Sequence, residues 1–436
     1  MFQIVRHSGS LGMFGLWAVL LAAGQAHAAG FALREESAEA LGNAYAGATA
    51  KAYNLSTIFY NPAGMTRLEG NQTEGSVTWI MPEAVFNGQA SGTNGVGGTS
   101  GRLNGTTGAD AIMDAAVGAT YAMWDIAPDL KFGLAVTAPF GLRSHYRSDW
   151  VGRYQALTSN VTNINVSPSL AYRINDHLSI GGGPQIDYTR VTLSQAINFS
   201  AVGANDGRGT VQGDAVGFGG DVGLMWEFSP TSRIGLNYRS QIKRTLSGKA
   251  RYEGIPTTFG LSSNANFAND TAEADLTTPD VISFGLYHEV SPHWAVMSDV
   301  QFTRWSTFRE LRIKYGNSRD DSVVNENWND TWFFSLGATY RTNNIGQFHF
   351  GVAYDQSAVE DAHRTARIPD SNRYWVSLGY GYDLTPSHQL NLGYSHLFAD
   401  KVEINETSKT ALATSLLTGS YDGSVDIVSA SFAMKF

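Results

Sequence analysis

The segment RYWVSLGYGYDL, residues 373–384, alternates between two kinds of side chain. One face carries tyrosine, valine and leucine, and the other carries mainly glycine, serine and aspartate, with one tryptophan. Because successive side chains of a β-strand point to opposite sides, this pattern predicts a strand with one apolar face and one small or polar face. Strands of outer-membrane barrels alternate in this way, with the apolar face toward lipid.

Residues 347–355 and 216–228 repeat the pattern, with aromatic and branched side chains alternating with glycine, alanine and scattered polar residues. A soluble β-sandwich also alternates, but its polar face meets water and carries charged side chains. Small residues on the second face, and aromatic residues toward the strand ends, favour a barrel whose interior is filled.

Fourteen segments of this kind follow one another to the terminal Phe436, an even number, as a single-chain barrel requires. Short turns such as 175–177 alternate with longer loops such as 141–160 and 407–424. The predicted strands lie at 73–87, 111–124, 130–140, 161–173, 178–197, 213–228, 233–252, 271–289, 294–315, 326–341, 347–359, 373–384, 389–406 and 425–436. The fold class is therefore all-β, a 14-stranded antiparallel transmembrane barrel.

The start of the chain differs from this pattern. Arg6 precedes an apolar run at 11–23 and the small residues of Ala26-His27-Ala28, which together indicate a secretory signal peptide over residues 1–28. The next segment, 29–70, is rich in small residues and does not alternate, so we expect an N-terminal hatch of short helices that plugs the lumen. Residues 71–436 are then the barrel.

Composition limits the function classes. The chain has 436 residues and no cysteine, which excludes disulfides and thiolate metal sites. Without the signal peptide it carries 29 basic and 39 acidic residues, a net charge of −10, so nucleic acid is not an expected partner.

No serine-hydrolase elbow, zinc-protease motif or P-loop is present, and neither a cofactor nor a metal is expected. The histidines fit solvated turns. Four inward carboxylates fit a polar network in the lumen with arginine and lysine partners, although a phospholipase remains open: Asp187, Asp221, Asp299 and Asp355.

Seven short motifs resemble the long-chain fatty acid transporter (FadL) family, and they occur in order from Gly30 to Phe436. They are Ala29-Gly30-Phe31, Asn61-Pro62-Ala63, Thr137–Leu142, Pro168–Arg173, Thr303–Ser306, Ile368-Pro369-Asp370 with Arg373-Tyr374-Trp375, and Val402–Glu406. The family includes relatives that take up toluene, xylene and similar hydrocarbons.

This resemblance implies a monomeric channel in the outer membrane of a Gram-negative bacterium. A hydrophobic molecule would be captured between outer loops and passed to an inner pocket near the hatch. It would then leave sideways into the membrane at a kink in the third strand. The expected partners are long-chain fatty acids or other hydrophobic molecules, outer-membrane lipids, and the assembly machinery that recognises the C-terminal strand.

The resemblance also suggests site residues. Phe31 would contact the substrate in the inner pocket. Arg190 is the candidate partner for a fatty-acid carboxylate, with a lumen or rim salt bridge as the alternative; its face is opposite to the expected one unless a bulge lies near Tyr188–Arg190. Four apolar residues of the fourth outer loop are expected to line an outer groove: Ile255, Phe259, Leu261 and Phe267. The preceding loop, 198–212, is short and polar, which leaves the outer groove and the substrate open.

Two features suggest the gate. Pro62 in Asn61-Pro62-Ala63 fixes a backbone angle and so could hold the hatch against a strand, although an ordinary turn is the alternative. Gly133, Ala135 and Pro139 lie in a strand whose proline disrupts the ladder, which predicts the kink and lateral exit; a bulge or strand end is the alternative.

The sequence therefore predicts passive uptake of hydrophobic molecules, foremost long-chain fatty acids. Two alternatives remain: uptake of aromatic or aliphatic hydrocarbons by the same route, and an adhesin or structural barrel that acts through its loops.

Overall fold

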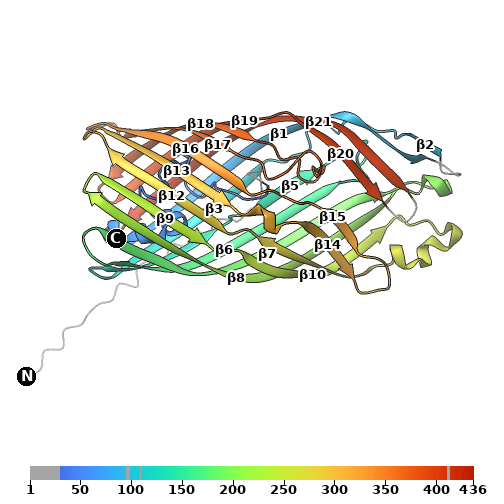
Figure 1. Cartoon of the computed structure of the whole chain (residues 1–436), viewed down its shortest axis with the longest axis horizontal. Helices are drawn as coiled ribbons and strands as arrows, with labels where there is room; N and C mark the ends of the chain where they lie inside the picture. The colour runs from blue at the N-terminus through green and yellow to red at the C-terminus, as the bar shows by residue number, and fades with distance from the viewer. Residues whose placement is uncertain (1–29, 95–98, 109, 410–412) are drawn as a thin grey trace, which may run out of the picture.

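The computed structural model describes residues 30–94, 99–108, 110–409 and 413–436, so the predicted signal peptide lies outside the described residues. These residues form one long barrel (Figure 1). Short turns and the C-terminus lie at one end of the barrel, and the long loops lie at the other. None of the helices in the described ranges is long and apolar enough to cross a membrane.

The barrel wall consists of fourteen antiparallel strands, as the sequence predicts, and it is closed by the pairing of the first strand with the last. Several wall strands are interrupted and carry two labels, and a further strand, β2 (Thr99–Arg102), extends β1 beyond the wall. In chain order the wall strands are β1 (Gln72–Asn94), β3 (Ala115–Ala127), β4 with β5 (Leu130–Thr137, Gly141–His145), β6 (Thr158–Arg173), β7 (Leu178–Ile197), β8 (Gly207–Ser229), β9 with β10 (Ser232–Arg239, Ile242–Glu253), β11 with β12 (Asp270–Thr278, Val281–Glu289), β13 with β14 (Trp294–Thr303, Glu310–Tyr315), β15 with β16 (Ser322–Asn325, Thr331–Arg341), β17 (Gln347–Asp355), β18 (Arg373–Thr385), β19 with β20 (His388–Ala399, Val402–Lys409) and β21 (Thr414–Lys435).

The alternation in the sequence corresponds to the two faces of the wall. In β18, Tyr374, Val376 and Leu378 are exposed on the outside, whereas Trp375 and Ser377 are buried inside. The same pattern continues around the barrel and produces a belt of exposed apolar side chains, as a lipid-facing surface requires.

Three loop predictions need comment. The short turns between wall strands are confirmed. The long loop predicted at 407–424 is wrong, because β20 and β21 continue as a paired hairpin from Val402 to Tyr421 and only its tip is a loop. The loop between β17 and β18 does not project outward: Ala358, Ala366 and Asp370 are almost fully buried.

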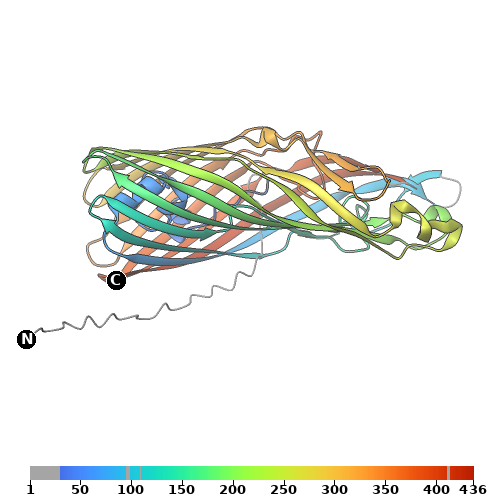
Figure 2. The same cartoon turned by 90° about the horizontal axis from the view of Figure 1, so that it is seen from below.

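The hatch, which we define as residues 30–70, lies inside the barrel toward the end with the short turns (Figure 2). It contains helices α1 (Ala38–Gly42) and α2 (Thr57–Tyr60) and the 3-10 helix η1 (Pro62–Arg67). The Ser37 side chain caps α1, and proline occupies the first turn of η1, where its missing N–H costs nothing. The other 3-10 helices lie in the loops: η2 (Ser200–Val202), η3 (Thr258–Ser263), η4 (Ala265–Phe267) and η5 (Trp305–Thr307).

Glycines on the inner face of the wall make room for the hatch. A Cβ at Gly351 would lie 2.1 Å from the carbonyl carbon of Asn43, and one at Gly235 would lie 2.0 Å from the carbonyl oxygen of Thr49. Since no side chain fits at these distances, the hatch backbone packs directly on the wall. The glycine-rich second face in the sequence is therefore the surface that carries the hatch.

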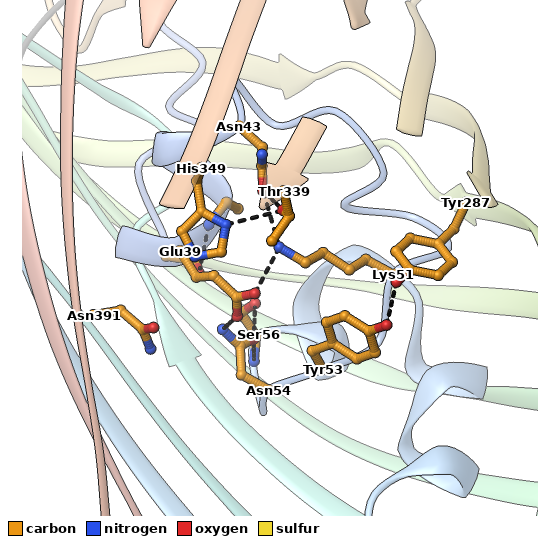
Figure 3. A network of polar contacts seen from close by, with 12 residues as sticks. Glu39, Asn43, Lys51, Tyr53, Asn54, Ser56, Tyr287, Thr339, His349 and Asn391 are labelled. Atoms are coloured by element: carbon orange, nitrogen blue, oxygen red, sulfur yellow. Dashed lines mark hydrogen bonds and ion pairs between the residues drawn. The ribbon is translucent and has the colours of Figure 1, made fainter. Parts of the chain in front are cut away.

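A buried polar network fixes the interior of the hatch (Figure 3). Lys51 forms an ion pair with Glu39 at 2.6 Å and donates to the side-chain oxygen of Asn43 at 2.9 Å. Asn54 donates to the other oxygen of Glu39 at 2.6 Å. Removing one partner of a buried ion pair leaves an uncompensated charge, so this network opposes unfolding of the hatch.

Candidate functional site

The third wall strand is broken at Ala138-Pro139-Phe140, between β4 and β5. Thr137 pairs with Asn165 of β6 and Gly141 pairs with Thr162, so three residues of the third strand oppose two of its neighbour. The extra residue exchanges the two faces of the strand: Thr137 is buried inside, and after the break Leu142 and Ser144 are.

The same break interrupts pairing with the second wall strand, β3. The β3–β4 ladder ends at Thr120 and Val136, and pairing resumes only where Met113 donates to Arg143. In the described part of the chain, residues 114–119 have no backbone partner on the third strand. The wall therefore has a local opening between β3 and the break.

The N-terminal end of the hatch supplies the hydrogen bonds that the neighbouring strand does not. Leu33 donates its N–H to Pro139 at 2.8 Å, and Gly141 donates to the carbonyl of Phe31 at 2.7 Å. Ala138 donates to the carboxyl group of Glu36 at 3.0 Å. Residues 31–36 thus form a short substitute ladder that holds the broken strand inward.

Glu36 is buried in this contact, and burial raises its pKa to about 8. Its second carboxyl oxygen has no hydrogen-bond partner among the described residues, and Tyr121 donates to its backbone carbonyl at 3.0 Å. A protonated Glu36 can occupy this site without a buried charge, whereas an ionised one cannot.

A cavity of about 80 Å³ lies between the hatch and the break. Its lining combines apolar and aromatic side chains with two arginines, Arg34 and Arg239. The Arg34 guanidinium lies 3.6 Å from Asp355, whereas Arg239 stacks on the ring of Phe59 and forms no direct ion pair with the residues described. The remaining lining residues that face the break are Ala32, Leu33, Pro139 and Phe140.

Next to this cavity, Phe31 occupies an aromatic box. Its ring centroid lies 4.9 Å from that of Trp305, 5.6 Å from that of Trp328 and 5.8 Å from that of Phe308. Phe140 from the break completes the box at 5.9 Å. The box therefore joins the hatch, the broken strand and two outer segments of the wall around one side chain.

The three exit residues predicted from the sequence are not equivalent. Pro139 lies in the break and lines the cavity. Gly133 and Ala135 lie in the regular part of β4 and face inward, where a Cβ at Gly133 would lie 2.4 Å from the sulfur of Met65. These two residues pack against the hatch and do not border the opening.

Asn61-Pro62-Ala63 lies on the other side of the hatch. Asn61 donates to Thr49 at 2.8 Å within the hatch and to Leu224 of β8 at 3.0 Å. Ala63 is fully buried against Gly181 of β7. The tripeptide contacts the wall at β7 and β8, whereas the break is held by residues 31–36.

Arg190 faces the outside of the barrel. The β6–β7 and β7–β8 registers run without a shift from Ile186 to Ser194, so the bulge predicted near Tyr188–Arg190 is absent and that prediction is wrong. Arg190 is exposed and donates to Gln212 at 2.7 Å. A partner for a carboxylate in the lumen must therefore be another residue.

Buried polar side chains of the lumen do form a network, as predicted. Asp187 forms an ion pair with the fully buried Arg244, and Asp355 forms one with Arg373 at 3.1 Å. Asp299 accepts instead from the backbone and hydroxyl of Thr49 of the hatch, both at 2.9 Å. Asp221 accepts from the backbone of Gly183 at 3.1 Å.

The four apolar residues of the fourth outer loop do not share one surface. Leu261 and Phe267 are buried with Phe199 of the preceding loop, and Ile255 packs against them. Phe259 is 82% exposed at the loop tip. The two loops therefore form a small core of their own, and only Phe259 stands free of it.

Sequence reasoning missed Glu36 and Arg239. Glu36 follows two other charged residues in a segment without periodicity, so nothing in the sequence marks it. Arg239 lies at the last position of β9, immediately before an irregularity at Ser240 and Gln241 that exchanges the faces of that wall strand. An alternation that fails between Tyr238 and Lys243 was the available signal.

Comparisons with known proteins agree with this geometry. Residues 19–436 match the family model described as outer membrane protein transport protein (OMPP1/FadL/TodX). A long-chain fatty acid transport protein of Escherichia coli is 27% identical, with 89% of this chain and 91% of that protein covered. An outer membrane protein of Neisseria meningitidis is 28% identical, with 90% of each chain covered.

Solved structures show the same fold. A FadL homologue of Pseudomonas aeruginosa superposes with a TM-score of 0.85 at 24% identity, covering 94% of this chain and all of that one. The toluene transporter TodX of Pseudomonas putida gives 0.68 at 17% identity, covering 92% and 98%. The family match over nearly the whole length, together with the closed barrel, shows that this chain belongs to the OMPP1/FadL/TodX family of outer-membrane transport proteins for hydrophobic compounds.

Proposed function

We propose that this protein takes up long-chain fatty acids passively and releases them sideways into the outer membrane through the opening beside the third wall strand. The observation that carries this proposal is the substitute ladder between residues 31–36 and the break. It places the only elements needed for a gate, a movable hatch end and an unpaired wall segment, next to one cavity.

The route suits an apolar substrate. Exposing a methylene group to water costs about 0.8 kcal/mol, so a chain of ten or more methylenes gains several kcal/mol from a path that ends in hydrocarbon. An opening in the wall supplies such an end, whereas a continuous water-filled pore does not.

Arg239 is the proposed partner of the substrate carboxylate in place of Arg190. It lines the cavity, and its Nε has no hydrogen-bond partner among the described residues. Arginine binds carboxylates through paired N–H donors, and a charge-assisted bond of this kind fixes one end of a long ligand. Phe31, which adjoins the cavity, would contact the chain of the same ligand.

A second candidate function is uptake of aromatic hydrocarbons. The observation in its favour is the box around Phe31, because four aromatic rings at centroid distances of 4.9 to 5.9 Å already enclose one benzene-type ring. A neutral ring would need no cation, so this candidate makes Arg239 irrelevant to uptake.

Uptake of labelled oleate and labelled toluene by cells with and without the protein tests both candidates. We expect oleate uptake to depend on the protein, and Arg239→Met to weaken oleate binding by about tenfold, the loss of one charge-assisted bond, while toluene uptake stays unchanged. Protein-dependent toluene uptake without oleate uptake would favour the second candidate. If neither compound depends on the protein, transport is excluded and an adhesin or structural barrel remains.

A further inference from the structure

Five basic side chains lie together on the outer surface of the barrel, directly beyond the apolar belt. We call them the basic strip; they belong to β5, β7, β8 and β10. The strip consists of Arg143, Arg190, Arg208, Lys249 and Arg251.

Cross-strand pairing shows that the strip is continuous. Asn160 joins Arg143 to Thr192, and Gln212 joins Thr192 to Lys249, so Arg143 and Lys249 lie in one row across neighbouring strands. Arg190 lies in the adjacent row on the belt side, and Arg251 lies in the adjacent row on the loop side. Neighbouring strands are about 4.8 Å apart, so the row spans roughly 20 Å.

The strip begins where the belt ends. Val216 is exposed and pairs with Tyr188, and Arg190 is the next outward residue along β7. Two residues advance about 6.6 Å along a strand, which is about 5 Å of height at the usual tilt of barrel strands. Arg190 therefore lies at the depth of the lipid headgroups, and Arg143 and Lys249 lie within reach of them.

The cations of the strip are not used within the protein. The ion pairs of the neighbouring loops and lumen join other residues, and among the described side chains none of the five strip cations forms an ion pair. Three carboxylates face outward in the same band, namely Asp214, Glu253 and Glu273, which leaves two positive charges in excess. Cations kept unpaired beside a membrane indicate an anionic partner from that membrane.

The opposite side of the barrel has the reverse charge. Along β20, β21 and β1 the band beyond the belt contains two lysines, Lys401 and Lys409, and four carboxylates: Glu83, Glu403, Asp422 and Asp426. An anionic lipid is therefore attracted to one side and repelled from the other.

We propose that the basic strip binds the phosphate groups of the phosphorylated glycolipid that forms the outer leaflet of the outer membrane. Arginine and lysine bind phosphate through charge-assisted hydrogen bonds, and the acyl chains of the same lipid cover the belt below. Arg143 lies on β5, beyond the break, so the bound lipid borders the opening in the wall.

The test uses the full-length protein in detergent and native mass spectrometry, with lipid A and dephosphorylated lipid A as probes. The double variant Arg190→Ser, Lys249→Ser removes two charges from the strip. The matched control, Lys401→Ser, Lys409→Ser, removes two charges from the opposite side. All four positions are exposed, and heat modifiability on a gel verifies that each variant is folded.

We expect the wild type to retain lipid A in preference to the dephosphorylated form. The strip variant should bind lipid A roughly tenfold or more weakly, at about fivefold for each charge removed, whereas the control should change by less than about twofold. Equal losses in both doubles would reduce the effect to net charge, and equal binding of the dephosphorylated lipid would exclude phosphate recognition; either result overturns the proposal. Displacement of lipid A by millimolar inorganic phosphate would identify a site for free anions and not for a lipid. None of these outcomes depends on which substrate is transported.

Discussion

Two strands of the wall contain proline, yet only one of them is broken. The third strand stops at Ala138-Pro139-Phe140 and loses six residues of pairing with β3. The fifth strand, β7, contains three successive glycines and Pro184, and still pairs with β8 at every position from Leu178 to Ile197. Only its ladder to β6 skips positions near Pro184.

The difference lies in what each strand meets inside the barrel. At the third strand, Leu33 and Glu36 of the hatch bind the backbone of the break. At the fifth strand, Gly181 packs on Ala63, and the hatch offers β7 no substitute ladder. A missing proline N–H weakens a ladder, but an alternative set of backbone partners is what stabilises a break. The opening in the wall is therefore a product of the hatch.

The largest expected effect follows from restoring the register of the third strand. Deleting Ala138 leaves two residues opposite two of β6, so β4 and β5 can join and pair with β3 throughout. With the opening closed, substrate uptake should fall by roughly tenfold or more, because the ligand would have to leave through water at about 0.8 kcal/mol per methylene. Transport assays on cells with equal amounts of folded protein measure this.

A matched deletion gives the contrast. Removing Gly183 shortens β7 by one residue where no hatch segment is paired with it, so it should disturb folding without creating or closing an exit. Undiminished uptake after deletion of Ala138 would show that substrate leaves by another route.

A second prediction concerns Gly133, which the sequence suggested as part of the exit. A Cβ there meets Met65 of the hatch, so Gly133→Leu should destabilise hatch packing by about 1–3 kcal/mol, the usual cost of overpacking, without touching the opening. The readout is protease sensitivity of the hatch in the folded barrel. Gly75→Leu is the control, since a Cβ at Gly75 meets nothing within 4 Å. Equal sensitivity of both variants would contradict the assigned contact.

A third prediction is a pH dependence of the substitute ladder. Because the pKa of Glu36 is about 8 when docked and ordinary when the hatch end is released, docking is fully favoured below the ordinary pKa of 4.5. It weakens as the pH rises toward 8, since an ionised carboxyl must take up a proton to be buried. Over that range, exchange of the Ala138 amide should accelerate by more than about tenfold.

Glu36→Gln should remove this dependence, because a neutral amide keeps the acceptor for Ala138 at every pH. Glu35→Gln is the neighbouring control: Glu35 is also buried, but its carboxyl group binds the backbone of Arg34 and not the break. A pH dependence that survives in Glu36→Gln and disappears in Glu35→Gln would assign the effect to the wrong carboxyl group.

The fold was predictable because alternation is a local signal. In β18 each residue between Arg373 and Leu378 shows its face by its own chemistry, and the number of wall strands follows from repeating that reading. Local reading fails where partners are distant or faces are exchanged. The 414–424 half of the last hairpin lacks clear alternation, so it resembled a loop, although pairing with β20 makes it a strand.

The candidate site was harder to predict for the same reason. Its bonds join residues 31–36 to residues 138–141, more than a hundred positions apart, and no pattern in either segment encodes the other. Arg190 illustrates the second failure: a bulge was assumed to turn it inward, but the continuous register keeps it outside. Its exposed position instead makes it part of the basic strip.

The smallest expected effects come from the two prolines themselves. Pro139→Ser leaves the carbonyl that accepts from Leu33, so the break and the uptake should persist, with a stability change within about 0.5 kcal/mol if the new N–H meets water. Pro184→Ser, at an exposed position of a strand already paired with β8, should be equally mild. The two variants therefore separate the role of the hatch from that of the proline ring, because a break caused by the ring would close in Pro139→Ser. Loss of uptake in that variant alone, with the barrel folded, would show that the ring and not the hatch keeps the wall open.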